Sequence, residues 1–297
     1  MSLGETRPDS TDDGDQVRLA GGVGVELRGI NLADISDGEL AIIRQAFDEH
    51  SGLLFRGQRL TAQQLVAFSA RLGELDHAPV NENGRSIVEG MPELYVVSNI
   101  KGNDGKPIGS LGAGEAVWHT DMSYLANPPD ASLLYAIEIP PAGGDTWLAG
   151  MYAVLDDMPP DLRRRIAGRR IKHDGTYNSA GYVRAGLTPS DDPMTAAGTF
   201  HPAICRHPGS GREVLYLGRR RNAYVEGLEL ADSETLLDGL WAHATQQKYT
   251  YAHQWQVGDV LMWDNRATLH RRDEFDASHR RLMYRTQIKG RSAPTAA

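Results

Sequence analysis

The sequence has little cysteine, no long apolar run and no excess of basic residues. Its single cysteine, Cys205, excludes an intrachain disulfide and fits a reducing compartment, so we expect a cytoplasmic protein. No apolar run reaches the ~18 residues of a membrane-spanning helix. The net charge of −8 argues against nucleic acid or an anionic membrane as the main partner.

The order of patterns along the chain predicts one β-rich domain. Residues 1–16 are polar and rich in Asp, Ser and Thr, which predicts a disordered tail. No internal repeat or low-complexity linker interrupts residues 17–290, so we expect a single domain there, with a short tail at 291–297. Many short strand-like segments and a few peripheral helices predict a mostly β fold, namely a double-stranded β-helix (jelly roll, cupin-like).

Helix boundaries and irregular segments can also be placed. The sequences Ser36-Asp37-Gly38-Glu39 and Thr61-Ala62-Gln63-Gln64 are capping boxes that predict two helix starts, with Gly52 expected just beyond the end of the first helix. Pro159-Pro160 breaks a third helical region. Residues 75–114 are rich in Gly, Asn and Pro, which predicts either an active-site lid or an idle surface insertion.

A histidine and a carboxylate two residues apart stand in Trp118-His119-Thr120-Asp121, and a remote histidine, His270, follows Trp263-Asp264-Asn265-Arg266. Two histidines and one carboxylate form the facial triad of non-heme Fe(II) oxygenases. In a β-strand, His119 and Asp121 would point to the same face and could bind one ion. The bare pattern fits equally a buried histidine beside a solvated aspartate.

The last predicted strand carries two arginines on one face, because Arg281, Met283 and Arg285 alternate with Leu282, Tyr284 and Thr286. If that face points inward, the two guanidiniums require anions, and Arg is the natural bidentate partner of a carboxylate. If the strand lies on the surface, the arginines are solvated charges without a function.

Several of these motifs, in this order, resemble the taurine/2,4-dichlorophenoxyacetate (aryloxyalkanoate) dioxygenase family of Fe(II)- and 2-oxoglutarate-dependent oxygenases. The stretch ending in His119 and Asp121 resembles the W-H-x-D ligand motif of that family, and His270 follows the segment that carries the distal ligand. Gly143-Gly144-Asp145-Thr146 resembles its G-G-x-T turn. Arg281 lies where the family places the arginine that binds the distal carboxylate of 2-oxoglutarate.

The resemblance implies a function and its cofactors. His119, Asp121 and His270 would be the metal ligands and catalytic centre for Fe(II), and Thr146 and Arg281 would bind 2-oxoglutarate. With O₂, such an enzyme hydroxylates a C–H bond and releases succinate and CO₂. The chemistry belongs to the iron centre, while the protein positions the reactants and excludes water. Relatives commonly form dimers or tetramers, so a homo-oligomer is expected.

The substrate can be predicted only as a class. Arg285 matches a second family arginine that grips anionic substrates, which favours a sulfonate, an aryloxy acid or another carboxylate. Further candidates for substrate binding are His77, Glu115 and Tyr177. His77 lies one position early for the His-Pro pair of taurine-binding members, and Glu115 stands where those members have Asn. Both departures argue against taurine itself.

Two other functional classes are compatible with parts of the sequence. A cupin-type metal enzyme that does not use 2-oxoglutarate would not require Thr146 and Arg281 at their positions. A non-catalytic jelly-roll binding protein would have no reason to keep a complete ligand set.

Overall fold

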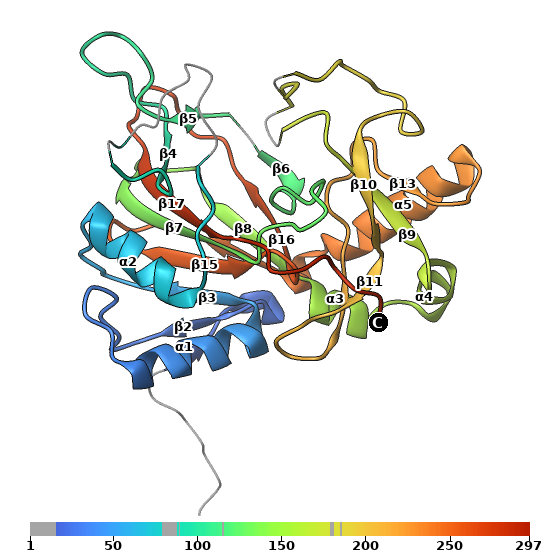
Figure 1. The fold of residues 1–297 in the computed structure, drawn as a ribbon, viewed down its shortest axis with the longest axis horizontal. Coiled ribbons are helices and arrows are strands. Elements are labelled where there is room, and N and C mark those ends of the chain that lie inside the picture. Colours follow the sequence, from blue (N-terminus) through green and yellow to red (C-terminus); the bar gives the residue numbers. More distant parts are fainter. Residues whose placement is uncertain (1–15, 79–87, 89, 115, 179–180, 185) are drawn as a thin grey trace, which may run out of the picture.

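The computed structural model describes residues 16–78, 88, 90–114, 116–178, 181–184 and 186–297 (Figure 1). The described part is mostly β, with few helices. The predicted N-terminal tail lies outside the described residues except for Gln16, which begins the first strand. None of the described helices combines the length and the apolar composition that crossing a bilayer requires.

An eight-stranded sheet forms the centre of the molecule. Its neighbouring strands are antiparallel apart from two parallel pairs, β2 with β3 and β4 with β5. The pairing brings the C-terminal strands β15 and β17 to either side of β7, from the middle of the chain. In spatial order the strands are β1 (Gln16–Arg18), β2 (Val25–Leu27), β3 (Gly52–Phe55), β15 (Val260–Asp264), β7 (Ala131–Glu138), β17 (Leu282–Ile288), β4 (Tyr95–Ser98) and β5 (Ser110–Leu111).

A second, four-stranded antiparallel sheet carries the segments singled out in the sequence. Its spatial order is β14 (Thr250–His253), β8 (Thr146–Gly150), β16 (Thr268–Arg272) and β6 (Ala116–His119). Two smaller sheets lie beyond it. They consist of β10 (Gly198–Pro202), β9 (Arg170–Asp174) and β13 (Tyr224–Val225), and of β11 (Ile204–Arg206) and β12 (Glu213–Leu215).

The helices begin largely where their capping residues predict. Both capping boxes are formed, so the starts predicted at Ser36 and Thr61 are confirmed, and the predicted break at Pro159-Pro160 separates α3 from α4. The first helix ends at His50, so Gly52 lies beyond its end as predicted; Ser51 takes the left-handed turn (φ 64°), and Gly52 already belongs to β3. The helices are η1 (Ala20–Gly22), α1 (Asp37–His50), α2 (Ala62–Leu72), α3 (Met151–Asp156), α4 (Pro160–Ile166), α5 (Leu230–Ala244) and η2 (Gln247–Tyr249).

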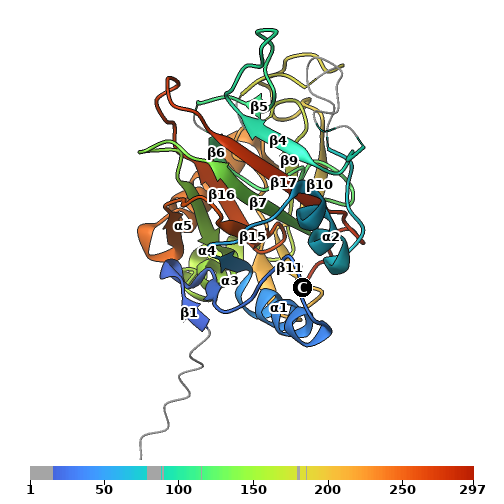
Figure 2. The ribbon, with the colours of Figure 1, turned by 90° about the vertical axis from the view of Figure 1, so that its left-hand side faces the viewer.

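Alternation along the central strands divides the core into layers. On β7, Leu133 and Tyr135 pack with the apolar sides of α1 and α2, which lie together on one side of the large sheet (Figure 2). Leu134 and Ala136 point the other way and pack with Leu148 of the four-stranded sheet. The two sheets therefore face each other, and inward residues of β6, β8, β16 and β17 share the space between them.

The C-terminal segment 291–297 lies along β11, where the C-terminus is marked in Figure 1. The backbone N–H of Arg206 donates to Thr295, and that of Ala297 donates to Ile204. Arg291 also donates to the buried carboxylate of Asp130 at 2.8 Å. These contacts fasten the segment predicted as a tail to the rest of the described chain.

Candidate metal centre and ligand cavity

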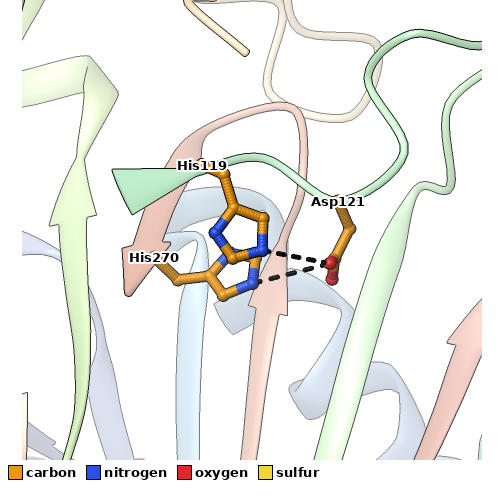
Figure 3. A group of neighbouring side chains, drawn as sticks. All are labelled: His119, Asp121 and His270. Atoms are coloured by element: carbon orange, nitrogen blue, oxygen red, sulfur yellow. Dashed lines mark ion pairs between the residues drawn. The ribbon is translucent and has the colours of Figure 1, made fainter. Parts of the chain in front are cut away.

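Three buried side chains converge between the two sheets. His119 on β6 and His270 on β16 are direct cross-strand partners, so both imidazoles point inward at the same level. Each Nε2 lies 3.6 Å from Oδ1 of Asp121. Figure 3 marks both ion pairs with dashed lines. Ligand atoms of the three residues all lie within 4.8 Å of one another. A separation of 3.6 Å is too long for a hydrogen bond but suits donors that surround one ion.

The route by which Asp121 reaches the two histidines differs from the one expected. Strand β6 ends at His119, and Asp121 lies in the turn that follows rather than on the same strand face. The backbone N–H of Thr120 donates to Gly218, which ends the pairing with β16, and Met122 adopts a left-handed conformation (φ 45°). The turn, and not strand alternation, therefore directs the carboxylate.

Contacts at the far atoms fix two of the three donors, His119 and Asp121. Nδ1 of His119 contacts the carbonyl of Val117 at 2.7 Å, which leaves Nε2 directed at the centre. Oδ2 of Asp121 accepts from Ser132 Oγ and Arg285 Nη2, both at 2.8 Å, so Oδ1 remains available. Nδ1 of His270 has no partner among the described residues.

Burial and charge set the protonation of these donors. Burial lowers the pKa of His119 to about 3, so its ring is neutral at pH 7 and has a lone pair for a metal. Burial alone would raise the pKa of Asp121, but the charge of Arg285 and the contacts with both histidines hold that pKa well below its usual value. The neutral imidazole of His119, the carboxylate of Asp121 and the ring of His270 therefore face a common point.

A network around Ser132 supports the carboxylate. Ser132 Oγ accepts from the side-chain amides of Asn265 and Gln287, each at 3.1 Å, while it donates to Asp121. Nothing in the sequence singles out Ser132 or Gln287, which look like ordinary strand residues. Only the pairing of β7 with β15 and β17 places them under Asp121.

A second feature of the site is a buried, unpaired guanidinium. Arg281 is 1% exposed, and its Nε and Nη2 have no hydrogen-bond partner among the described residues. Burial, and then the charge of Arg272, lower the pKa of Arg281 to about 9. Such a cation is costly unless an anion meets it. The structure thus shows a place that fits a carboxylate from outside the chain.

Thr146 and the preceding turn belong to the same region. Thr146 is the cross-strand partner of Arg272, and its Oγ1 accepts from Trp255 Nε1 at 3.1 Å. Gly144 has a positive φ of 70°, and a Cβ there would lie 3.5 Å from Arg281 Nε. The left-handed turn therefore brings the backbone against the guanidinium. Arg272, buried in the same place, was not singled out by sequence reasoning.

A cavity of about 1040 Å³ opens onto the triad. His119, Asp121 and Arg285 line it, whereas Thr146 and Arg281 are not part of its wall. Much of the remaining wall comes from the predicted lid segment, including Asp76, His77, Ala78, Glu93, Lys101, Ser110, Leu111 and Gly112. That segment is therefore part of the cavity wall.

The other predicted substrate residues have different surroundings. His77 lines the cavity, while Glu115 lies outside the described residues. Tyr177 is buried but does not line the cavity: its hydroxyl donates to Asp191 at 3.4 Å, and its ring lies 3.4 Å from the guanidinium carbon of Arg221. The cavity wall includes instead Tyr124, Asn178, Tyr182, Arg184 and Arg219.

Comparison with known proteins gives the family of the chain. A model of the family described as "Taurine catabolism dioxygenase TauD, TfdA family" matches residues 15–287, and the chain belongs to this family. It is 34% identical over 265 residues to an alpha-ketoglutarate-dependent 2,4-dichlorophenoxyacetate dioxygenase of Burkholderia sp. (strain RASC), covering 86% of this chain and 88% of the relative.

Solved structures give the same family. A taurine dioxygenase from Burkholderia xenovorans superposes with a TM-score of 0.75 at 32% identity, covering 95% of this chain and 92% of the other. AAD-2, solved in complex with Mn(II) and N-oxalylglycine, also has a TM-score of 0.75, at 27% identity and with 95% and 98% of the two chains covered.

Proposed function

We propose that the chain is an Fe(II)- and 2-oxoglutarate-dependent dioxygenase that hydroxylates a C–H bond of a small anionic substrate, with release of succinate and CO₂. The observation that carries the proposal is a buried His-Asp-His triad next to a buried arginine that lacks an anion. Membership of a dioxygenase family supports the same reaction.

His119, Asp121 and His270 would hold the metal through Nε2, Oδ1 and Nε2. Bound Fe(II), with 2-oxoglutarate and O₂, supplies the oxidising chemistry that cleaves a substrate C–H bond. The protein's part is to hold three donors on one side of the ion and to keep the rest of its surroundings open. Ser132 and Arg285 contribute by holding Oδ2 of Asp121. The presence of Asp121 favours hydroxylation over halogenation, because related halogenases lack this carboxylate.

Arg281 and Thr146 would bind the distal carboxylate of 2-oxoglutarate. The guanidinium is already dehydrated in the free protein, so an entering carboxylate gains charge-assisted hydrogen bonds without the cost of stripping water from Arg281. Arg272 adds a second positive charge from the neighbouring strand position.

The substrate is proposed to be a sulfonate, an aryloxy acid or another carboxylate. Arginines in the cavity wall, among them Arg285, favour an anion there. His77 remains a candidate contact, as does Glu115, while the contacts of Tyr177 make it a support for the wall. We further propose that the facing sheets form a double-stranded β-helix (jelly roll) in one domain, 17–290, and that the protein is a cytoplasmic homo-oligomer.

Succinate release from 2-oxoglutarate tests this function. Purified protein with Fe(II) and O₂ should form succinate, and more when a suitable sulfonate, aryloxy acid or sulfate ester is added. His119→Ala should abolish the release, and Arg281→Ala should raise the KM for 2-oxoglutarate at least ~100-fold. Equal succinate release by wild type and both variants would rule out the proposal, and so would its absence from wild type.

A further inference from the structure

Three consecutive arginines, Arg219, Arg220 and Arg221, follow strand β12 and differ in their ion-pair partners. Arg220 donates to Glu234 and Asp238, each at 2.7 Å, and Arg221 donates to Asp191 at 2.7 Å. Both are therefore paired with acids at the surface. Arg219 points the other way, into the wall of the cavity, and forms no ion pair with any described residue.

Arg219 is held rigidly but is not neutralised. It is 6% exposed, and its backbone bridges to His119, which places it at the edge of the metal centre. Nη1 donates to the carbonyl of Tyr177 at 2.5 Å, while the buried Nε has no partner. Burial, followed by repulsion from Arg184, lowers the pKa of Arg219 to about 10. The charges of Asp174 and Asp121 act on Arg219 in the opposite direction, but neither carboxylate forms an ion pair with it, and the oxygens of Asp174 accept from backbone N–H groups of Thr176 and Tyr177.

Arg184 adds a second cation to the same part of the wall. Its guanidinium lies 4.2 Å from the centre of the Tyr124 ring, and its buried Nε also lacks a partner. Its backbone N–H donates to Thr176 at 2.8 Å, which fixes the segment against β9. An anion bound between these two like charges would relieve their repulsion.

Arg285, unlike Arg219 and Arg184, has an ion-pair partner in the described part of the chain. Its Nη2 lies 2.8 Å from Oδ2 of Asp121, so its charge already has a carboxylate partner. Arg285 extends from β17 of the large sheet, whereas Arg219 reaches the triad from the side of β6. Arg219, which has no ion-pair partner among the described residues, therefore lies on the wall opposite Arg285.

We propose that Arg219 and Arg184 bind the acid group of the substrate, and that Arg285 mainly positions Asp121. The inference rests on the proposed function and assigns the substrate's anionic end to a particular wall of the cavity. A carboxylate, sulfonate or sulfate group would accept hydrogen bonds from both guanidiniums, beside the ring of Tyr124. Arg285 would then act through the metal ligand rather than on the substrate.

Binding of matched acids and amides tests this assignment. The probes are phenoxyacetate with phenoxyacetamide, hexanoate with hexanamide, and hexanesulfonate with hexanesulfonamide, titrated calorimetrically into protein loaded with Mn(II) and N-oxalylglycine. Wild type should bind at least one acid ~10-fold or more tightly than its amide. Arg184→Gln and Arg219→Gln should each reduce that ratio below ~3, and Arg219→Lys should retain part of it. The matched control Arg221→Gln, whose guanidinium lies outside the cavity wall, should keep the wild-type ratio.

Two results would overturn the assignment. One is the absence of any acid preference in wild type; the other is a preference that survives in Arg184→Gln and Arg219→Gln but disappears in Arg285→Gln. If Arg219→Gln does not fold, the half-buried Arg184 decides alone. Succinate release without added substrate is measured in parallel: if it is present, a failed acid preference refutes only this assignment, and if it is absent, the proposed function itself fails.

Discussion

Replacement of Arg281 by Met should have opposite effects on stability and on 2-oxoglutarate binding. Burial, and then the charge of Arg272, lower the pKa of this guanidinium to about 9, and a shift of this size from the usual arginine value corresponds to a cost of about 5 kcal/mol at ~1.36 kcal/mol per pH unit. Because the folded pKa is depressed, this cost is fully present below pH 9 and is relieved only as the pH rises above it. A methionine of similar length removes the charge and keeps the backbone hydrogen bonds to Ser98 and Asn99.

Only part of this cost should reappear as stability, since the apolar side chain does not pack perfectly. We expect the ligand-free Arg281→Met protein to be ~1–4 kcal/mol more stable than wild type at pH 7.5, seen as a melting temperature ~2–6 °C higher. With Mn(II) present, 2-oxoglutarate should raise the melting temperature of wild type by several degrees and that of the variant hardly at all.

Differential scanning calorimetry of both proteins, with and without Mn(II) and 2-oxoglutarate, measures all four states. The reasoning is refuted if the ligand-free variant is less stable than wild type while 2-oxoglutarate stabilises both equally. Arg280→Met is the matched control: Arg280 pairs with Glu138 at the surface, so its loss should change stability by less than ~1 kcal/mol and leave the 2-oxoglutarate effect intact.

Two further predictions concern the groups behind the metal ligands. Ser132→Ala removes a hydrogen bond to Asp121 and should weaken Mn(II) binding ~10–100-fold in a calorimetric titration; unchanged affinity would contradict a supporting role for Ser132. Burial alone would raise the pKa of Asp264, but Arg266 and His207 hold it well below 3.8, so Asp264→Asn should cost ~3–5 kcal/mol of unfolding free energy at pH 7. The stabilisation by this carboxylate is complete above pH ~4 and is lost as the pH falls towards its folded pKa. The difference in unfolding free energy between wild type and variant, measured by urea unfolding, should therefore shrink below pH ~4. A difference independent of pH would show that the charge of Asp264 does not stabilise the protein.

The helix starts could be predicted because the interactions that cap a helix join neighbouring residues. The capping boxes at Ser36 and Thr61 need only four consecutive residues, and both formed as predicted. Gly52 lies beyond the end of the first helix as predicted, although Ser51 and not the glycine adopts the left-handed conformation. Strand order could not be predicted, since it depends on pairing between residues more than a hundred positions apart, such as Leu134 with Leu261.

The candidate site was predictable as a set of residues but not as an arrangement. Motif spacing selected His119, Asp121 and His270, yet it attributed the position of Asp121 to strand alternation rather than to the turn after β6. Arg219 was missed because it is one of three adjacent arginines, and nothing local distinguishes the inward one from the two paired at the surface. Tyr177 was predicted to bind substrate, but it does not line the cavity, and its hydroxyl and ring contact Asp191 and Arg221.

His119, Asp121 and His270 are proposed to hold an Fe(II) ion to which 2-oxoglutarate binds. Anaerobic absorption spectroscopy tests this binding most directly. Chelation of Fe(II) by a 2-oxo acid produces a visible charge-transfer band that neither succinate nor glutarate can produce. We predict that this band appears when 2-oxoglutarate is added to the anaerobic Fe(II)-loaded protein, and that it is lost in His270→Ala. A wild-type protein without the band, or a His270→Ala variant with an undiminished band, would contradict the account.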